Sequence, residues 1–218
     1  MLTVMAIVAR AFISYSAKRG PRPLVICGPS GSGKSTLLKR LFAEYPETFG
    51  FSVSHTTRKP RAGEQNGVHY HFVSAEQMST LIGNDEFIET ATFSGNQYGT
   101  SKQAVYDVQA QGKVCVLDIE IQGVEQIKKS HLDPVYIFNM PPTVEDLEKR
   151  LKKRGTETEE TLAKRLEAAG REMAYGQAPG NFDIIVVNDD LDRAYEEFRN
   201  FIVTSIQKQI SEGINVKL

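Results

Sequence analysis

The stretch "GPSGSGKS", Gly28 to Ser35, decides the fold because it matches the pattern G-x-x-x-x-G-K-[ST] in the context that this pattern requires. An apolar run, Leu24 to Cys27, precedes it, and a helical pattern that begins Thr36-Leu37-Leu38 follows it. Glycines allow backbone conformations that turn successive N–H groups inward, so the loop and the start of the helix together form a cradle for an anion. A Gly-Ser turn that only joins a strand to a helix is the alternative, and it explains the lysine less well.

Two side chains give this loop its expected chemistry. Lys34 is placed to reach the β- and γ-phosphates of a nucleotide, and Ser35 is placed to offer a hydroxyl to Mg²⁺. Asp118 ends the apolar run "VCVLD", at the edge of the sheet where open α/β proteins bind their ligands. We therefore predict Ser35 and Asp118 as metal-binding residues, while an Asp that merely ends a strand remains an alternative. The loop residues predicted to contact ATP are Gly28, Pro29, Ser30, Gly31, Ser32, Gly33, Lys34, Ser35 and Thr36.

Short apolar runs and amphipathic segments alternate from Arg22 onward, which predicts a parallel sheet covered by helices on both faces. The predicted strands are residues 24–27, 51–54, 114–119, 135–140 and 183–187. The predicted helices are residues 35–44, 102–111, 144–153, 159–173 and 191–210.

Composition limits the possible functions. The chain has 218 residues, 40% of them hydrophobic, which suits one lobed domain. Lys and Arg total 26 against 27 Asp and Glu, so no global positive field favours binding to nucleic acid or to an anionic membrane. No apolar run approaches the roughly 20 residues that span a bilayer, so we expect a soluble protein. Cys27 and Cys115 lie inside apolar runs, which favours buried free thiols and a reducing compartment.

The first twenty residues, "MLTVMAIVARAFISYSAKRG", contain three basic residues and no acidic one. Organelle transit peptides share this composition. A disordered leader is the simpler interpretation, so we expect a cytoplasmic protein and keep a mitochondrial location as the alternative.

Cations cluster locally in "HTTRKPRAGE", residues 55–64, although the chain as a whole is nearly neutral. Two guanidinium groups, those of Arg58 and Arg61, suit a phosphate dianion because each can donate two hydrogen bonds at once. An exposed basic turn is the alternative. Lys59, between the two arginines, is expected to face water.

The chain closely resembles the guanylate kinases, the ATP:GMP phosphotransferases, of eukaryotic type. The resemblance runs from Arg22 to about Ile210. Six motifs carry it in order: "GPSGSGKSTL", "FSVSHTTRKPRAGEQNGVHYHFV", "FIETATFSGNQYGTS", "LDIEIQG", "RLKKRGTETEE" and "VNDDLDRAY".

The resemblance implies a site for GMP. It assigns the GMP phosphate to Arg58, Arg61, Tyr70 and Tyr98, and the guanine base to Ser54, Glu89 and Thr100. A carboxylate can accept from guanine N1–H and the exocyclic amine together, whereas adenine presents the opposite pattern. Glu89 could otherwise be only the polar side of the alternating strand 87–93. The full GMP-binding set is Ser54, Arg58, Arg61, Tyr70, Glu89, Tyr98, Gly99, Thr100 and Glu120.

Glu120 departs from the family pattern, which has Asp near the guanine or its ribose. Further along the chain, the resemblance implies a lid whose arginines close over the ATP phosphates: Arg150, Arg154 and Arg165. An exposed pair of charged helices is the alternative for this segment. Asn188, in "VVND", matches a family position near the adenine. The predicted catalytic residues are Lys34, Arg150, Arg154 and Arg165.

Together these features predict the P-loop nucleoside monophosphate kinase fold, an α/β fold with a five-stranded parallel sheet, a small mixed β/α lobe and a helical lid. The expected divisions are a leader, 1–20; a guanylate kinase-like domain, 21–210; and a C-terminal tail, 211–218. Within the domain we expect a core of residues 21–53, 101–149 and 176–210, a GMP-binding lobe of residues 54–100 and a lid of residues 150–175.

The expected activity is transfer of the γ-phosphoryl group of ATP to GMP, and to dGMP, by a monomer that uses Mg²⁺ and binds neither nucleic acid nor membranes. Two alternatives stay open at this point. One is a non-catalytic guanylate-kinase-like scaffold domain that binds phosphopeptides, and the other is a kinase for a different nucleoside monophosphate.

Overall fold

The computed structural model describes residues 20–218 except 62, 94 and 156–157. The predicted leader therefore lies almost wholly outside the described residues. In chain order the elements are β1 (Leu24–Cys27), α2 (Lys34–Glu44), β2 (Phe49–Phe51), β3 (His55–Thr56), β4 (His71–Phe72), α3 (Ala75–Gly83), β5 (Phe87–Phe93), β6 (Asn96–Ser101), α4 (Lys102–Ala110), β7 (Val114–Asp118), α5 (Ile121–Ile127), β8 (Val135–Met140), α6 (Val144–Arg154), α7 (Glu159–Gln177), β9 (Ile184–Val187) and α8 (Leu191–Ser211).

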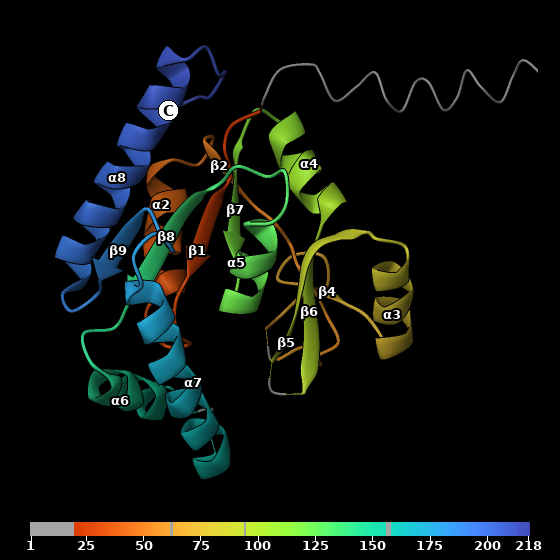
Figure 1. Ribbon diagram of the computed structural model, residues 1–218, viewed down its shortest axis with the longest axis vertical. Helices are drawn as coiled ribbons and strands as arrows, with labels where there is room; N and C mark the ends of the chain where they lie inside the picture. Colours follow the sequence, from red (N-terminus) through yellow and green to blue (C-terminus); the bar gives the residue numbers. More distant parts are fainter. Residues whose placement is uncertain (1–19, 62, 94, 156–157) are drawn as a thin grey trace, which may run out of the picture.

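Five parallel strands form the main sheet in the order β2-β7-β1-β8-β9, which confirms the predicted architecture. Successive side chains of β1 point to opposite faces of the sheet. Leu24 and Ile26 pack into one core with α2 and α8, whereas Val25 and Cys27 pack into a second core with α4 and α5. Helices therefore cover both faces of the sheet (Figure 1). This burial on both faces explains why the strand sequences read as continuous apolar runs.

A second sheet has four short strands in the order β4-β3-β6-β5 and lies to one side of the main sheet (Figure 1). It is mixed, because β3 pairs parallel with β4 while β6 pairs antiparallel with β3 and β5. Helix α3 completes this lobe, and its capping box joins Ser74 to Gln77.

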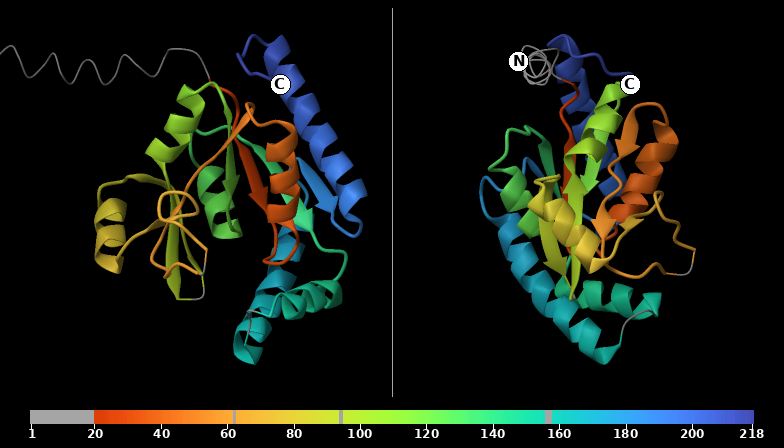
Figure 2. Two further views of the ribbon diagram at one scale, coloured as in Figure 1. Left: turned by 180° about the vertical axis from the view of Figure 1, so that it is seen from behind. Right: turned by 90° about the vertical axis from the view of Figure 1, so that its right-hand side faces the viewer.

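Helices α6 and α7 form a separate helical arm at the end of the main sheet where β1 and β7 finish (Figures 1 and 2). They pack on each other through Leu147, Leu151 and Ala169. Thr143 caps α6 and Thr158 caps α7, each accepting from a backbone N–H of the first turn. The arm and the small sheet thus lie on either side of the carboxyl ends of the strands.

The sequence-based predictions were wrong in some details. The predicted strand 51–54 is instead β2, Phe49–Phe51, because the buried side chain that anchors it is Phe49 and the chain then passes into the second sheet at His55. Helices α3 and α5 were not predicted. The two cysteines are free and buried, as expected.

No helix among the described residues is both long enough and apolar enough to cross a bilayer.

Candidate active site

The loop between β1 and α2 lies close against the neighbouring segments, and glycine stands at the positions where the loop comes nearest to them. A Cβ on Gly28 would lie 2.2 Å from the backbone oxygen of Asn139, and one on Gly33 would lie 2.2 Å from Nδ2 of Asn188. Both glycines also have positive φ angles, 145° and 102°. Since the first turn of α2 carries no acidic residue, its free N–H groups and positive dipole end remain available to an anion.

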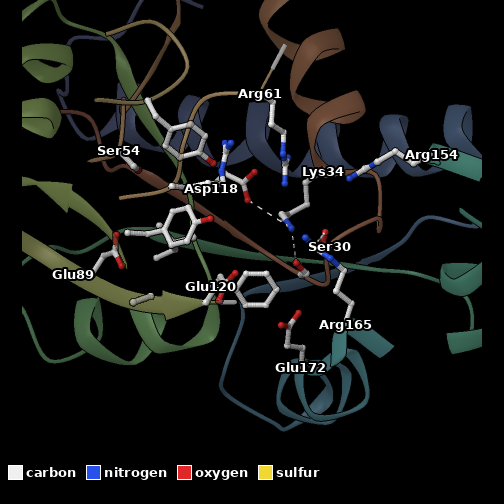
Figure 3. Close-up of a pocket in the computed structure, with 17 residues that line it drawn as sticks. Ser30, Lys34, Ser54, Arg61, Glu89, Asp118, Glu120, Arg154, Arg165 and Glu172 are labelled. Atoms are coloured by element: carbon white, nitrogen blue, oxygen red, sulfur yellow. Dashed lines mark hydrogen bonds and ion pairs between the residues drawn. The ribbon is translucent and has the colours of Figure 1, made fainter. Parts of the chain in front are cut away.

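Lys34 lies between this loop and the neighbouring strand. Its Nζ donates to the backbone oxygen of Gly28 over 2.5 Å and forms an ion pair with Oδ1 of Asp118 at 3.7 Å (Figure 3). Burial raises the pKa of Asp118, and the Lys34 ammonium group opposes that rise. The lysine is therefore held at the base of the loop by groups that a phosphate could replace.

The oxygen donors expected at a Mg²⁺ site are present here. The Asp118 carboxylate ends β7, and Ser35 is exposed in the first turn of α2. No group of three or more His, Cys, Asp or Glu in the described part of the chain is arranged to hold a metal ion. The predicted donors are the Asp118 carboxylate and the Ser35 hydroxyl. This donor set fits Mg²⁺, which keeps several waters and takes further oxygens from phosphates.

A second cationic group lies across the cleft, in the predicted basic loop. Arg58 makes two hydrogen bonds of 2.9 Å to the two carboxylate oxygens of Glu64, and the Arg61 N–H donates to the same carboxylate over 2.6 Å. Hydrogen bonds from Arg58 lower the pKa of Glu64 to about 2. Glu64 therefore shapes this loop. Sequence reasoning missed it, although its spacing three residues after Arg61 is a readable signal.

Two tyrosine side chains pack beside this cationic group. The Arg58 guanidinium lies 5.3 Å from the centre of the Tyr70 ring, which packs edge-on against Tyr98 at 6.1 Å. Burial raises the pKa of Tyr70 to about 12, so its hydroxyl stays protonated and able to donate.

The expected base-reading residues lie together on β5, β6 and the segment before β3. Oγ of Ser54 lies 3.3 Å from Oγ1 of Thr100, and Thr100 pairs in register with Glu89. Glu89 is only 4% exposed, and burial raises its pKa, opposed by hydrogen bonds from Thr100. Gly123 of α5 allows this arrangement, since a Cβ there would lie 2.6 Å from the Glu89 carboxylate.

The helical arm supplies the remaining wall. Nη1 of Arg165 donates to Oγ of Ser30 over 2.8 Å, and its guanidinium lies 5.2 Å from the centre of the Phe93 ring. Two carboxylates, Glu120 and Glu172, face the same space (Figure 3). Burial raises the pKa of Glu172. Sequence reasoning missed Glu172, whose only signal is its spacing of seven residues, two helical turns, from Arg165.

A cavity of about 200 Å³ brings most of the predicted residues together. The predicted residues that line it are Gly28, Ser30, Lys34, Ser54, Arg58, Arg61, Tyr70, Glu89, Tyr98, Asp118, Glu120, Arg154 and Arg165. Four lining residues were not predicted: Ala91, Phe93, Ile119 and Glu172. The predicted residues outside this lining are Pro29, Gly31, Ser32, Gly33, Ser35, Thr36, Gly99, Thr100, Arg150 and Asn188.

Arg150 and Asn188 lie behind the loop rather than in the cavity. Nη1 of Arg150 donates to the Ser32 oxygen over 3.3 Å, and Nη2 donates to the Asn188 oxygen over 2.7 Å. Asn188 itself is buried and donates from Nδ2 to the Ser32 oxygen over 2.8 Å. The predicted catalytic role of Arg150 and the predicted adenine contact of Asn188 stay predictions.

The acidic pair gives the free protein a testable pH dependence. Burial and the neighbouring Glu172 raise the pKa of Glu120 from 4.5 to about 7, against the opposing charge of Lys34. The folded protein thus binds more protons than the unfolded chain between these pH values, so the free energy of unfolding should fall as pH rises through this window. We expect Glu120→Gln to stabilise the protein by about 1 to 3 kcal/mol at pH 8 and by little at pH 4.

Urea denaturation of the nucleotide-free protein across this pH range measures the effect. Glu125→Gln, at an exposed position on α5, is the control and should leave the pH dependence unchanged. Parallel stability curves for wild type and Glu120→Gln would contradict the prediction.

Comparisons with known proteins point to one family. A family model described as guanylate kinase matches residues 20–205. The chain is 55% identical to guanylate kinase of Sus scrofa over 193 residues, covering 88% of this chain and 98% of that protein. It is 55% identical to guanylate kinase of Homo sapiens over 194 residues, covering 89% and 98%. A crystal structure of guanylate kinase from Anaplasma phagocytophilum matches with a TM-score of 0.64 at 30% identity, covering 86% of this chain and 87% of that one.

Proposed function

This chain belongs to the guanylate kinase family, and from that premise we propose how its residues carry out the reaction. It transfers the γ-phosphoryl group of ATP to GMP, giving ADP and GDP. One observation supports the division of roles that follows. The phosphate-binding loop, two arginines of a second cationic group and a buried carboxylate all line one cavity.

In this proposal the loop Gly28–Thr36 binds the ATP phosphates, with Lys34 directed to the β- and γ-phosphates. Arg58, Arg61, Tyr70 and Tyr98 hold the GMP phosphate. Arg58 exchanges part of its bonding with Glu64 for the phosphate, because a carboxylate and a phosphate each present a pair of oxygens that suits its fork of donors.

Glu89, Ser54 and Thr100 read the guanine base. A carboxylate buried to this degree needs the two neighbouring donors that guanine offers, and adenine would leave it unpaired. Glu120 lies close enough to the same space to contact the base or the ribose. We include dGMP as a second acceptor.

Ser35 and Asp118 would hold Mg²⁺ together with the ATP phosphates. When bound, the ion neutralises charge that develops on the transferred phosphoryl group. Lys34 lies 3.7 Å from Asp118, so the same carboxylate also orients the lysine toward the loop.

No side chain is needed as a nucleophile, because an oxygen of the GMP phosphate attacks the γ-phosphorus directly. The protein holds the two reactants in line and neutralises charge with Lys34, Arg154 and Arg165. The α6–α7 arm closes over the cavity and excludes water, the competing acceptor. Arg150 supports this closure from behind the loop.

We propose a monomer as the active unit. The free buried thiols of Cys27 and Cys115 support a reducing compartment, so we propose a cytoplasmic location and retain the mitochondrial alternative for residues 1–20.

Steady-state kinetics with coupled detection of ADP test the proposal. We expect GMP to be the best acceptor in a panel with dGMP, AMP, UMP and dTMP. Arg61→Ala should raise the KM for GMP by about 10- to 100-fold, because it removes a charged partner of the phosphate.

Lys59→Ala is the matched control, since Lys59 is exposed and lies outside the cavity lining. A better acceptor than GMP would identify another monophosphate kinase, and no ADP release would favour the scaffold alternative. Equal effects of Arg61→Ala and Lys59→Ala would overturn the assignment of the phosphate site.

A further inference from the structure

Asn139 is a polar residue buried in the centre of the molecule. It lies on β8 between strands β1 and β9 and is 0% exposed, and most residues of β8 are apolar. Its Nδ2 donates to the backbone oxygen of Ser32 over 3.0 Å and lies 3.0 Å from Oγ of the same residue. Its Oδ1 has no hydrogen-bond partner among the described residues. An apolar side chain would avoid this unpaired acceptor, so the position is not explained by stability alone.

The Ser32 oxygen receives donors from three separate elements. Besides Asn139, it accepts from Nδ2 of Asn188 over 2.8 Å and from Nη1 of Arg150 over 3.3 Å. These donors come from β8, from the end of β9 and from helix α6. Because Ser32 is itself 0% exposed, water cannot take the place of a donor that is removed.

The geometry of the peptide bond connects this contact to the phosphate cradle. In a planar trans peptide the C=O and the next N–H point in opposite directions. Donors that hold the Ser32 oxygen toward the interior therefore hold the Gly33 N–H away from the interior, on the side of the loop where the cradle opens. Gly33 has a φ of 102°, a conformation that its neighbours must hold in place.

The loop also packs closely against the backbone of Asn139. Gly28 approaches the backbone of Asn139 so closely that a Cβ would lie 2.2 Å from its oxygen. Both ends of the glycine-rich segment thus rest on the same residue of β8. Lys34 donates to the oxygen of Gly28. The approach of Gly28 is to the Asn139 backbone, which any residue provides, so the Ser32 contact is the one that depends on the asparagine side chain.

We propose that Asn139 is a positioning residue for phosphoryl transfer, which holds the Ser32 oxygen so that the Gly33 N–H faces the ATP phosphates. The inference rests on the proposed role of the loop in binding ATP. The proposal predicts that Asn139 affects the binding of ATP and does not affect the binding of GMP.

Asn139→Leu keeps the γ-branched shape and the number of side-chain heavy atoms and removes the donor, and Asn139→Asp places a carboxylate oxygen against the Ser32 oxygen. We expect Asn139→Leu to raise the KM for ATP by about 10- to 100-fold, and Asn139→Asp to raise it further. The affinity for GMP, measured by calorimetry in the absence of ATP, should stay within twofold of wild type. The melting temperature of Asn139→Leu shows whether the variant is folded, so that a change in its KM for ATP can be attributed to the lost donor.

Asn181→Leu is the matched control. Asn181 donates from Nδ2 to the oxygen of Tyr175 over 2.9 Å and does not line the cavity. This variant should change stability without changing the KM for ATP. Asn139→Ser, which is smaller and uncharged, provides the same kinetic comparison if Asn139→Asp does not fold.

A KM for ATP within twofold of wild type in folded Asn139→Leu and Asn139→Ser would overturn the proposal. Parallel losses of ATP and GMP affinity would also overturn it, since they indicate a purely structural role. Lys34→Ala distinguishes this failure from failure of the proposed function. A defective Lys34→Ala beside normal Asn139 variants refutes only the role of Asn139, whereas a normal Lys34→Ala refutes the role of the loop.

Discussion

Lys34→Ala should lower kcat by at least about a thousandfold while leaving the affinity for GMP nearly unchanged, because a cation directed at the transferred group acts mainly in the transition state. Lys34 is the cation nearest to both the loop and Asp118, with its Nζ 2.5 Å from the Gly28 oxygen and 3.7 Å from the Asp118 carboxylate. Alanine would leave that carboxylate without its ion-pair partner. The pKa of Asp118, already raised by burial, should then rise further.

Single-turnover measurement of phosphoryl transfer gives the rate, and calorimetry gives the affinity for GMP. Lys39→Ala, an exposed position on the same helix α2, is the control and should keep wild-type turnover. Unchanged turnover in Lys34→Ala would contradict the assignment of the loop as the ATP phosphate site. A large loss of GMP affinity would instead indicate that the variant disturbs the whole cavity.

The main sheet could be predicted from the sequence because local patterns encode it. The run before Gly28 and the run that ends at Asp118 are buried on both faces, so they contain nothing but apolar residues before their polar ends. The motif at Gly28–Ser35 then fixed which end of the sheet binds ligand. Strand β2 was placed two residues too late, since only the sheet shows that Phe49 and not the exposed Phe51 is its anchor.

Glu172 and Asn139, which sequence reasoning missed, act through contacts between distant segments. Glu64 is different, because it pairs with Arg58 within the same loop and does not itself line the cavity. Glu172 meets Glu120 only because α7 folds back over the end of β7. Asn139 looks like an irregularity in an apolar strand until the Ser32 oxygen, 107 residues away in the chain, is placed beside it.

Helices α3 and α5 were not predicted, for two different reasons. Helix α3 carries a readable capping box from Ser74 to Gln77, so its start was available in the sequence. Helix α5 has only seven residues and contains Gly123, which weakens its local preference for helix. Its position is set instead by packing against β5, where Gly123 makes room for the Glu89 carboxylate.

Glu89→Gln should lower kcat/KM for GMP by about a thousandfold and remove most of the preference for GMP over AMP, because it replaces one of two acceptors with a donor. Guanine presents two adjacent donors, and the glutamine NH₂ would oppose one of them at a position largely shielded from water. The parent carboxylate is 4% exposed and its pKa is raised by burial, so its charge is unfavourable in the free protein. The neutral variant should therefore fold at least as stably as wild type.

A loss of activity without a loss of stability separates base recognition from structural damage. The kinetic panel of GMP, dGMP, AMP, UMP and dTMP measures the change in preference, and thermal unfolding measures the stability. Glu86→Gln is the matched control, because Glu86 is exposed three residues before Glu89 and outside the cavity. Since the preference is predicted to come from a pair of acceptors at one buried position, Glu89→Asp should keep the preference for GMP at a reduced rate. An unchanged ratio of GMP to AMP activity in Glu89→Gln would contradict this role and transfer base recognition to Ser54, Thr100 or Glu120.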